Sequence, residues 1–167
     1  TGRTLTLSFG QSEDLLPQVK LKANGDAFLS HDPYMKYAED AGSLTRYVVV
    51  GYVMPVLVVA PGNPKGIETL EDFARPGLKV CLPNPEYSTC GQIMADVLDK
   101  RGLKAKVMEN AGNALFRSHG EIATAIQLGQ RDAGVMWNGM AHERKGKIEI
   151  VPGAVPGAAE TRVALMG

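Results

Sequence analysis

The stretch from Pro61 to Gly102 constrains the fold most, because a complete strand, a turn and a helix follow one another within it. Leu78–Leu82 is a short β-prone run that ends at Pro83-Asn84-Pro85. A helix then opens at Thr89–Gln92, whose end residues have the spacing of a capping box. Such a turn aims free N–H groups and the positive end of a helix dipole at one point, which favours an anion. Many α/β proteins contain the same turn and bind nothing there, so both interpretations stay open.

Composition sets the class of protein. A chain of 167 residues is one domain or two small lobes, and its 44% apolar content indicates a globular protein with a core. The formal net charge is zero, with 18 basic and 18 acidic residues, which argues against nucleic acid as the main partner. No run of about eighteen apolar residues is present, so no membrane span is expected. The lack of a signal peptide decides nothing, because a mature secreted chain would have lost it.

The two cysteines, Cys81 and Cys90, are nine residues apart and allow two interpretations. They can form a disulfide in an oxidising compartment, or Cys81 is a buried strand residue and Cys90 a free thiol. The second is favoured, because a strand residue and a helix-start residue need not face each other. A thiol at a helix start is also the setting for a lowered pKa, so Cys90 with His119 is a candidate nucleophile and base. No orienting carboxylate stands at a recognisable spacing.

The remaining strands are predicted from β-prone runs. Thr4–Phe9 alternates as a half-buried strand does, with its apolar residues on one side. Further strands are expected at 26–30, 47–60, 105–108 and 131–137. Residues 147–151 and 162–166 would return the chain to its first lobe.

Helices are predicted from start signals. Ser118 and Glu121 have the spacing of a second capping box and open a helix. Pro33 starts another, because proline suits a first helical turn.

The central stretch carries a family resemblance. NPKGIETLEDFA, a strand, and then NPEYSTCG leading into a helix resemble the second lobe of the periplasmic molybdate-binding proteins, which are type 2 solute-binding proteins of ABC importers. The resemblance runs from Leu7 to about Leu165, with the elements in the same order. It implies an α/β fold of the periplasmic-binding-protein type 2 class, with two Rossmann-like lobes and a ligand cleft between them. Lobe one would be 1–60 plus 145–167, and lobe two 61–144.

The resemblance also implies a ligand site. Ser12 corresponds to a serine whose N–H and hydroxyl contact the bound oxyanion, and helix N-termini at Cys90 and His119 supply further N–H donors. Trp137 stands where the family has a tyrosine; an indole can donate one hydrogen bond but cannot accept one. Each residue also has an ordinary structural interpretation: a helix cap for Ser12, an exposed loop residue for His119 and core filling for Trp137.

The implied ligand is molybdate or tungstate, distinguished from sulfate by cavity size. The implied partner is the membrane permease of an ABC importer. The resemblance predicts a periplasmic or secreted monomer that has no cofactor and catalyses no reaction.

Acidic residues beside Ser12 depart from the family pattern and leave an alternative. Glu13 and Asp14 replace small neutral residues and would repel a nearby anion. With Cys90, His119 and His31 they could instead hold a soft or borderline metal ion in the same fold. No short-range spacing such as CxxC or HxxxH supports that metal site.

The resemblance leaves parts of the family pattern uncovered. Family members begin with a strand and helix before the one at Leu5 and end with one or two helices after Met166, all in lobe one. The missing first piece carries another oxyanion-binding serine. The chain therefore resembles the middle of such a protein, as a truncated form or as one whose lobe one is completed by something else.

Overall fold

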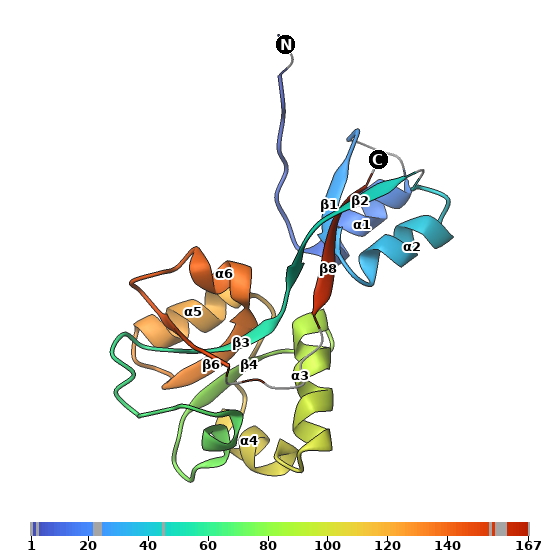
Figure 1. Ribbon diagram of the computed structural model, residues 1–167. Coiled ribbons are helices and arrows are strands. Elements are labelled where there is room, and N and C mark those ends of the chain that lie inside the picture. The colour runs from blue at the N-terminus through green and yellow to red at the C-terminus, as the bar shows by residue number, and fades with distance from the viewer. Residues whose placement is uncertain are drawn as a thin grey trace. The chain divides into compact units, whose positions relative to one another are not determined.

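The computed structural model describes residues 2, 4–21, 25–44, 46–153, 155 and 160–166, and the chain divides into two compact units (Figure 1). Unit 1 is Thr1–Tyr52 with Thr161–Gly167, and unit 2 is Val53–Glu160. These boundaries differ from the expected 1–60 plus 145–167 and 61–144. The difference arises because β3 (Pro55–Val59) and β7 (Glu149–Val151) pair with each other in the sheet of unit 2. No helix in the described part of the chain is long and apolar enough to cross a membrane.

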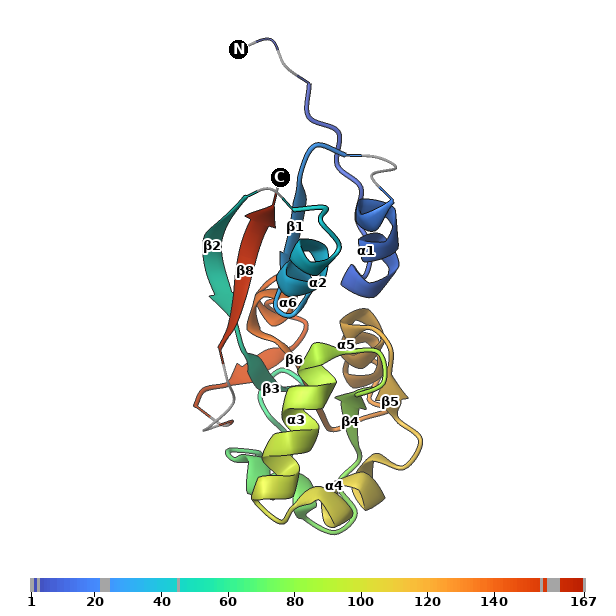
Figure 2. The ribbon, with the colours of Figure 1, turned by 90° about the vertical axis from the view of Figure 1, so that its right-hand side faces the viewer.

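Unit 1 is built on a three-stranded sheet whose strand order is β1-β8-β2. The strands are β1 (Phe28–His31), β8 (Thr161–Met166) and β2 (Tyr47–Val53). β1 and β2 lie close to their predicted positions, and β8 lies in the stretch expected to return the chain to its first lobe. Two helices, α1 (Ser12–Lys20) and α2 (Tyr34–Asp40), lie along this sheet (Figure 2). Their shared core is small, and its buried members are Leu16, Phe28, Met35, Ala38, Ala164 and Met166.

The strand predicted at Thr4–Phe9 is wrong, because those residues form no strand in the structure. Leu5 is 80% exposed and Phe9 is 89% exposed. Alternation marks which side chains can share a face, but a strand also needs a neighbour to accept and donate its backbone hydrogen bonds. Among the described strands, none pairs with this segment.

Unit 2 contains a five-stranded mixed sheet with the order β5-β4-β6-β3-β7. Its new members are β4 (Val80–Pro83), β5 (Leu115–Phe116) and β6 (Ala133–Trp137). β4 is parallel to both β5 and β6, whereas β3 is antiparallel to β6 and β7. The strands predicted after Leu78 and Arg131 are confirmed.

Helices cover both faces of this sheet. The elements are the 3-10 helix η1 (Leu70–Ala74), α3 (Thr89–Lys100), α4 (Lys104–Ala111), α5 (His119–Gln127) and α6 (Asn138–His142). Buried residues of η1, α3 and α4 belong to one core cluster, and those of α5 and α6 belong to a second. Figure 1 shows α5 and α6 together on one side of the strands.

The two cysteines belong to different clusters. Successive strand residues point to opposite faces, so Val80 and Leu82 enter the first cluster and Cys81 the second. Cys90 on α3 lies in the first cluster. Both cysteines are free and buried. The sheet between them explains why the disulfide alternative does not hold.

The strand predicted at Ala105–Met108 is wrong, because these residues lie within α4. Lysine, alanine, methionine and glutamate are good helix formers. Val107 and Ala111, four residues apart, are both fully buried, which is the spacing of one helix face.

The helix caps agree only in part with the sequence pattern. Ser88, not Thr89, is the N-cap of α3, and its Oγ accepts a hydrogen bond from Gly91 N–H at 3.4 Å. The predicted capping box between Ser118 and Glu121 at the start of α5 is confirmed.

Candidate functional site

Three parallel strands of unit 2 end at one edge of its sheet. Leu82 is paired with Leu115 and Cys81 with Gly134, so β5, β4 and β6 run side by side. β4 leads into α3, β5 into α5 and β6 into α6. We call this place, where the three strands end and the three helices begin, the carboxyl edge of unit 2. Crevices outside the carboxyl ends of parallel strands are where open α/β sheets bind ligands.

The first turn of α3 packs tightly against the end of β4. A Cβ atom at Gly91 would lie 2.5 Å from the Pro83 carbonyl oxygen and 2.8 Å from Pro85 N, so only glycine fits. The Cys90 N–H has no acceptor among the hydrogen bonds of the described residues. It therefore keeps the capacity to donate to an anion at the helix N-terminus.

The Cys90 side chain is not part of an exposed site. It is completely buried, and that burial raises the pKa of its thiol well above the ordinary value. Burial likewise raises the pKa of Cys81 to about 12. The predicted lowering of the Cys90 pKa is wrong, because the core desolvates the sulfur more than the helix dipole favours a thiolate.

The metal alternative loses its strongest ligand for the same reason, since metal ions bind the thiolate form. Within the described ranges, no group of three or more His, Cys, Asp or Glu side chains could hold a metal ion.

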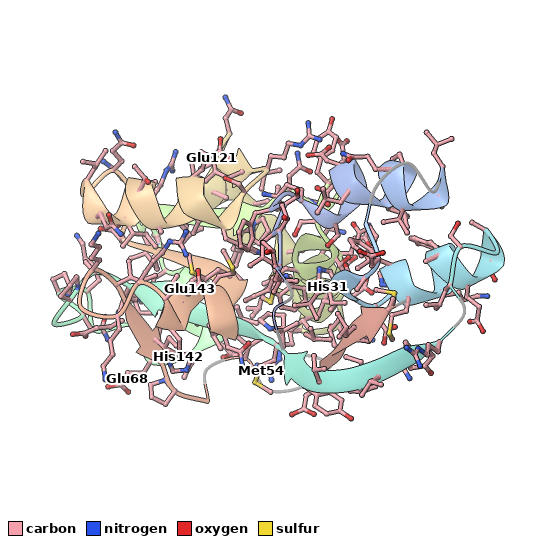
Figure 3. The ribbon with its side chains drawn as sticks, turned by 90° about the horizontal axis from the view of Figure 1, so that it is seen from above. His31, Met54, Glu68, Glu121, His142 and Glu143 are labelled. Atoms are coloured by element: carbon pink, nitrogen blue, oxygen red, sulfur yellow. The ribbon has the colours of Figure 1, made fainter. Side chains whose placement is uncertain are left out.

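The first turn of α5 is fixed by its capping box. Glu121, labelled in Figure 3, accepts hydrogen bonds from the N–H and the hydroxyl of Ser118, both at 2.9 Å. The Ser118 Oγ in turn accepts from Glu121 N–H at 3.3 Å. His119 is the first residue of the helix, and its ring meets the Trp137 ring edge-on with centroids 6.3 Å apart. The structure thus brings these two predicted site residues together.

Trp137 ends β6 and belongs to the core of unit 2, with 7% of its surface exposed. The next residue fixes the start of α6, because Asn138 Oδ1 accepts hydrogen bonds from Met54 N–H at 3.2 Å and from Gly139 N–H at 2.9 Å. The burial of Trp137 in this cluster confirms the interpretation that its side chain fills the core. Its contact with a ligand remains a prediction.

Two residues at this edge were missed from the sequence. The Arg117 guanidinium lies over the Tyr87 ring, with its Cζ 4.9 Å from the ring centroid. Arg117 immediately precedes Ser118, the N-cap of α5, and Tyr87 immediately precedes Ser88, the N-cap of α3. The cation–π contact therefore joins the two turns that present the α3 and α5 N-termini. Their positions before the two caps were visible in the sequence, but their contact depends on the β4–β5 pairing.

Ser12 belongs to unit 1, where it is the first residue of α1. It is not the helix cap: Gln11 holds that position and makes no side-chain capping bond. The Ser12 Oγ lies 2.8 Å from the Oγ of Ser30, a buried residue of β1. Sequence analysis missed Ser30, because a strand serine gives no signal until its neighbour is known.

Glu13, beside Ser12, also has contacts within unit 1. Tyr34 OH donates a hydrogen bond to Glu13 Oε2 at 3.3 Å. The other oxygen, Oε1, is buried and has no hydrogen-bond partner in the described part of the chain. His31, the last residue of β1, packs edge-on against Tyr34 with centroids 5.3 Å apart.

Comparison with known proteins identifies the family. The family described as bacterial extracellular solute-binding protein matches residues 1–164, so this chain belongs to it. The molybdate-binding protein ModA of Mycobacterium tuberculosis is 28% identical over 138 residues, which cover 81% of this chain and 51% of that protein. The chain therefore spans about half the length of this relative. The family consists of solute-binding proteins and not of enzymes.

Solved structures support the fold assignment. The substrate-binding domain of a putative molybdenum ABC transporter from Clostridium difficile matches with a TM-score of 0.66 at 19% identity, covering 98% of this chain and 72% of that one. A ferric binding protein from Campylobacter jejuni matches with a TM-score of 0.68 at 13% identity, covering 99% of this chain and 68% of that one. At these identities the matches show the fold alone, which is the periplasmic-binding-protein type 2 fold.

Proposed function

We propose that this protein is the extracytoplasmic solute-binding component of an ABC importer and that it binds a small tetrahedral oxyanion, molybdate or tungstate, in a cleft between its two lobes. The backbone N–H groups of Ser12, Cys90 and His119 and the indole N–H of Trp137 are the proposed donors. Aligned backbone dipoles can bind a dianion without a counter-charge, because several donors share the charge. The protein then delivers the ligand to a membrane permease and acts as a monomer.

One observation carries this proposal: three parallel strands of unit 2 end at one edge, with the N-termini of α3 and α5 there. Gly91 holds the α3 N-terminus against β4, and the capping box holds that of α5. The similarity to a molybdate-binding protein supplies the ligand class.

Native mass spectrometry of the purified protein tests the ligand class. After addition of molybdate or tungstate, a mass shift of one oxyanion per chain is expected, whereas sulfate at the same concentration should give much less. Failure of every tetrahedral oxyanion to bind would refute the proposal.

Trp137 tests the site. It is the only tryptophan, so the indole emission reports on one place, and molybdate should change the spectrum. Trp137→Phe keeps much of the packing but removes the donor. A hydrogen bond to a charged group contributes about 1.5–3 kcal/mol, so calorimetry should show affinity falling about ten- to a hundredfold.

The matched control is Tyr37→Phe, which removes a hydroxyl from the exposed side of α2 and should leave affinity unchanged. Equal affinity of the wild type and Trp137→Phe would exclude the indole from the site.

A further inference from the structure

We propose that Asn138 is a positioning residue for ligand binding: it holds Met54, where the chain passes from one unit to the other, and couples this crossing to the proposed ligand contact of Trp137. This inference rests on the proposed function and names a residue outside the proposed set of donors.

The crossing at Met54 is one residue long. β2 ends at Val53 in the sheet of unit 1, and β3 begins at Pro55 in the sheet of unit 2. Met54, labelled in Figure 3, is therefore the single residue between a strand of one sheet and a strand of the other. On the way back, β7 ends at Val151 and β8 begins only at Thr161. The crossing at Met54 is thus the shorter of these two connections.

Both backbone groups of Met54 are bonded to Asn138. The Met54 N–H donates to Asn138 Oδ1 at 3.2 Å, and the Met54 carbonyl oxygen accepts from Asn138 N–H at 2.9 Å. The same Oδ1 accepts from Gly139 N–H at 2.9 Å, which fixes the side chain at the start of α6. The next residues along the two strands, Pro55 and Trp137, are paired in the sheet. Because proline has no N–H to donate, the bonds of Met54 secure this end of β3.

These bonds join the crossing to the proposed site through one peptide unit. Trp137, whose indole N–H is a proposed donor, is followed directly by Asn138. A ligand that holds the Trp137 side chain therefore also restricts Asn138, and through it Met54. In the other direction, a crossing that is already ordered leaves less conformational entropy for the ligand to remove, so binding is tighter.

A second reciprocal pair at the opposite end of β6 provides a comparison. The Lys79 N–H donates to Asp132 Oδ2 at 2.8 Å, and the Asp132 N–H donates to the Lys79 carbonyl oxygen at 2.7 Å. Lys79 and Asp132 immediately precede β4 and β6, so this pair joins two strands inside unit 2. Asn138 and Asp132 thus make the same kind of contact, but only Asn138 acts on the crossing.

Hydrogen exchange of single amides, followed by NMR in the full 167-residue protein with and without molybdate, tests the coupling in the wild type. Coupling is reciprocal, so a bond that raises ligand affinity by some factor is stabilised by the same factor when the ligand binds. One hydrogen bond corresponds to a factor of about two to ten. The Met54 N–H should therefore exchange about two- to tenfold more slowly with saturating molybdate, whereas the Lys79 N–H should keep its ligand-free rate.

Asn138→Ala removes the acceptor and should lower molybdate affinity by the same factor of about two to ten in calorimetry. Asp132→Ala is the matched control and should leave molybdate affinity unchanged. Asn138→Asp keeps the acceptor, so the Met54 N–H should exchange as slowly as in the ligand-free wild type. Because its added charge also repels an anion, this variant is compared by exchange alone.

Two outcomes would overturn the inference and leave the proposed function intact: molybdate slowing the Met54 and Lys79 N–H groups equally in the wild type, or Asn138→Ala and Asp132→Ala losing affinity equally. Either would show that only general stability links these bonds to the ligand. The first measurement needs no variant, so a folding defect cannot obscure it. If no tetrahedral oxyanion binds to the wild type, both proposals fail.

Discussion

The two units of the chain cover their sheets to different extents. The five-stranded sheet of unit 2 has a buried cluster on each face, and β4 and β6 are buried along their whole length. The three strands of unit 1 keep large apolar side chains exposed, among them Val50 at 56% and Leu165 at 45%. Among the described residues of unit 1, one small cluster lies beneath α1 and α2.

This difference indicates where the folding free energy resides. Hydrophobic stabilisation grows with the apolar area removed from water, so a sheet buried on both faces contributes more than one buried on a single face. Unit 2 should therefore be the more stable unit. It also positions Cys90, His119 and Trp137.

The largest expected effect comes from a matched pair of core truncations. Phe73→Ala in η1 removes a fully buried ring and should lower the free energy of unfolding by about 3–5 kcal/mol. Phe28→Ala in unit 1 should cost less, because its cluster is smaller. Urea unfolding followed by Trp137 emission for unit 2, and by circular dichroism for the whole chain, measures both. Equal losses would refute the comparison.

A smaller effect is expected from crowding the α3 N-terminus. Gly91→Ala places a Cβ against the Pro83 carbonyl oxygen and should lower the unfolding free energy by about 1–3 kcal/mol. It should also weaken oxyanion binding, since it displaces the Cys90 N–H. Gly139→Ala in α6 is the control, because nothing lies within 4 Å of its Cβ position. If Gly91→Ala and Gly139→Ala show the same oxyanion affinity and the same unfolding free energy, the close contact between Gly91 and Pro83 has no role in either property.

Asp72 in unit 2 allows a test by pH. The Glu68 N–H and then the Thr69 N–H donate to its carboxylate and lower its pKa. A carboxyl group whose pKa is lower in the folded state than in the unfolded state stabilises the fold at any pH above its unfolded-state pKa. This stabilisation is lost as the pH falls through the folded-state pKa. Asp72→Asn should therefore cost about 1 kcal/mol at pH 7, the size of a lost cap, and much less in acid.

The comparison for Asp72 is Asp40→Asn in unit 1, which breaks an exposed pair with Lys36. Thermal unfolding at pH 7 and pH 3 should show a smaller loss there, because solvent screens exposed ion pairs and they contribute little to stability. A cost of Asp72→Asn that does not change with pH would contradict the assigned cause.

The smallest effect is expected on the exposed strand of unit 1. Val50→Thr should change the unfolding free energy by less than about 0.5 kcal/mol, since the side chain is more than half exposed. Val58→Thr, the same change at a fully buried position of β3, should cost about 1–3 kcal/mol. Denaturant titration of the pair measures the difference directly. A large loss for Val50→Thr would show that another surface covers it.

Local patterns in the sequence determined the elements that depend on neighbouring residues. The Ser118–Glu121 spacing places the start of α5, because the capping bonds close within four residues. The apolar run after Arg131 predicts β6, which is buried at every position. The separate environments of Cys81 and Cys90 also follow from a strand and a helix start.

Tertiary structure decided everything that depends on a distant partner. Thr4–Phe9 alternates like a strand but has no described strand beside it, whereas residues 105–108 join α4 because Val107 and Ala111 share a buried face. β3 and β7 belong to unit 2 because they pair with each other in its sheet. Unit 2 therefore extends beyond the expected range 61–144 at both ends. The contact between Arg117 and Tyr87, the hydrogen bond between Ser12 and Ser30, and the buried oxygen of Glu13 arise only when separate elements meet. A sequence encodes the local bonds of helices and caps within a few residues, but strand pairing and side-chain contacts across elements are fixed by the fold as a whole.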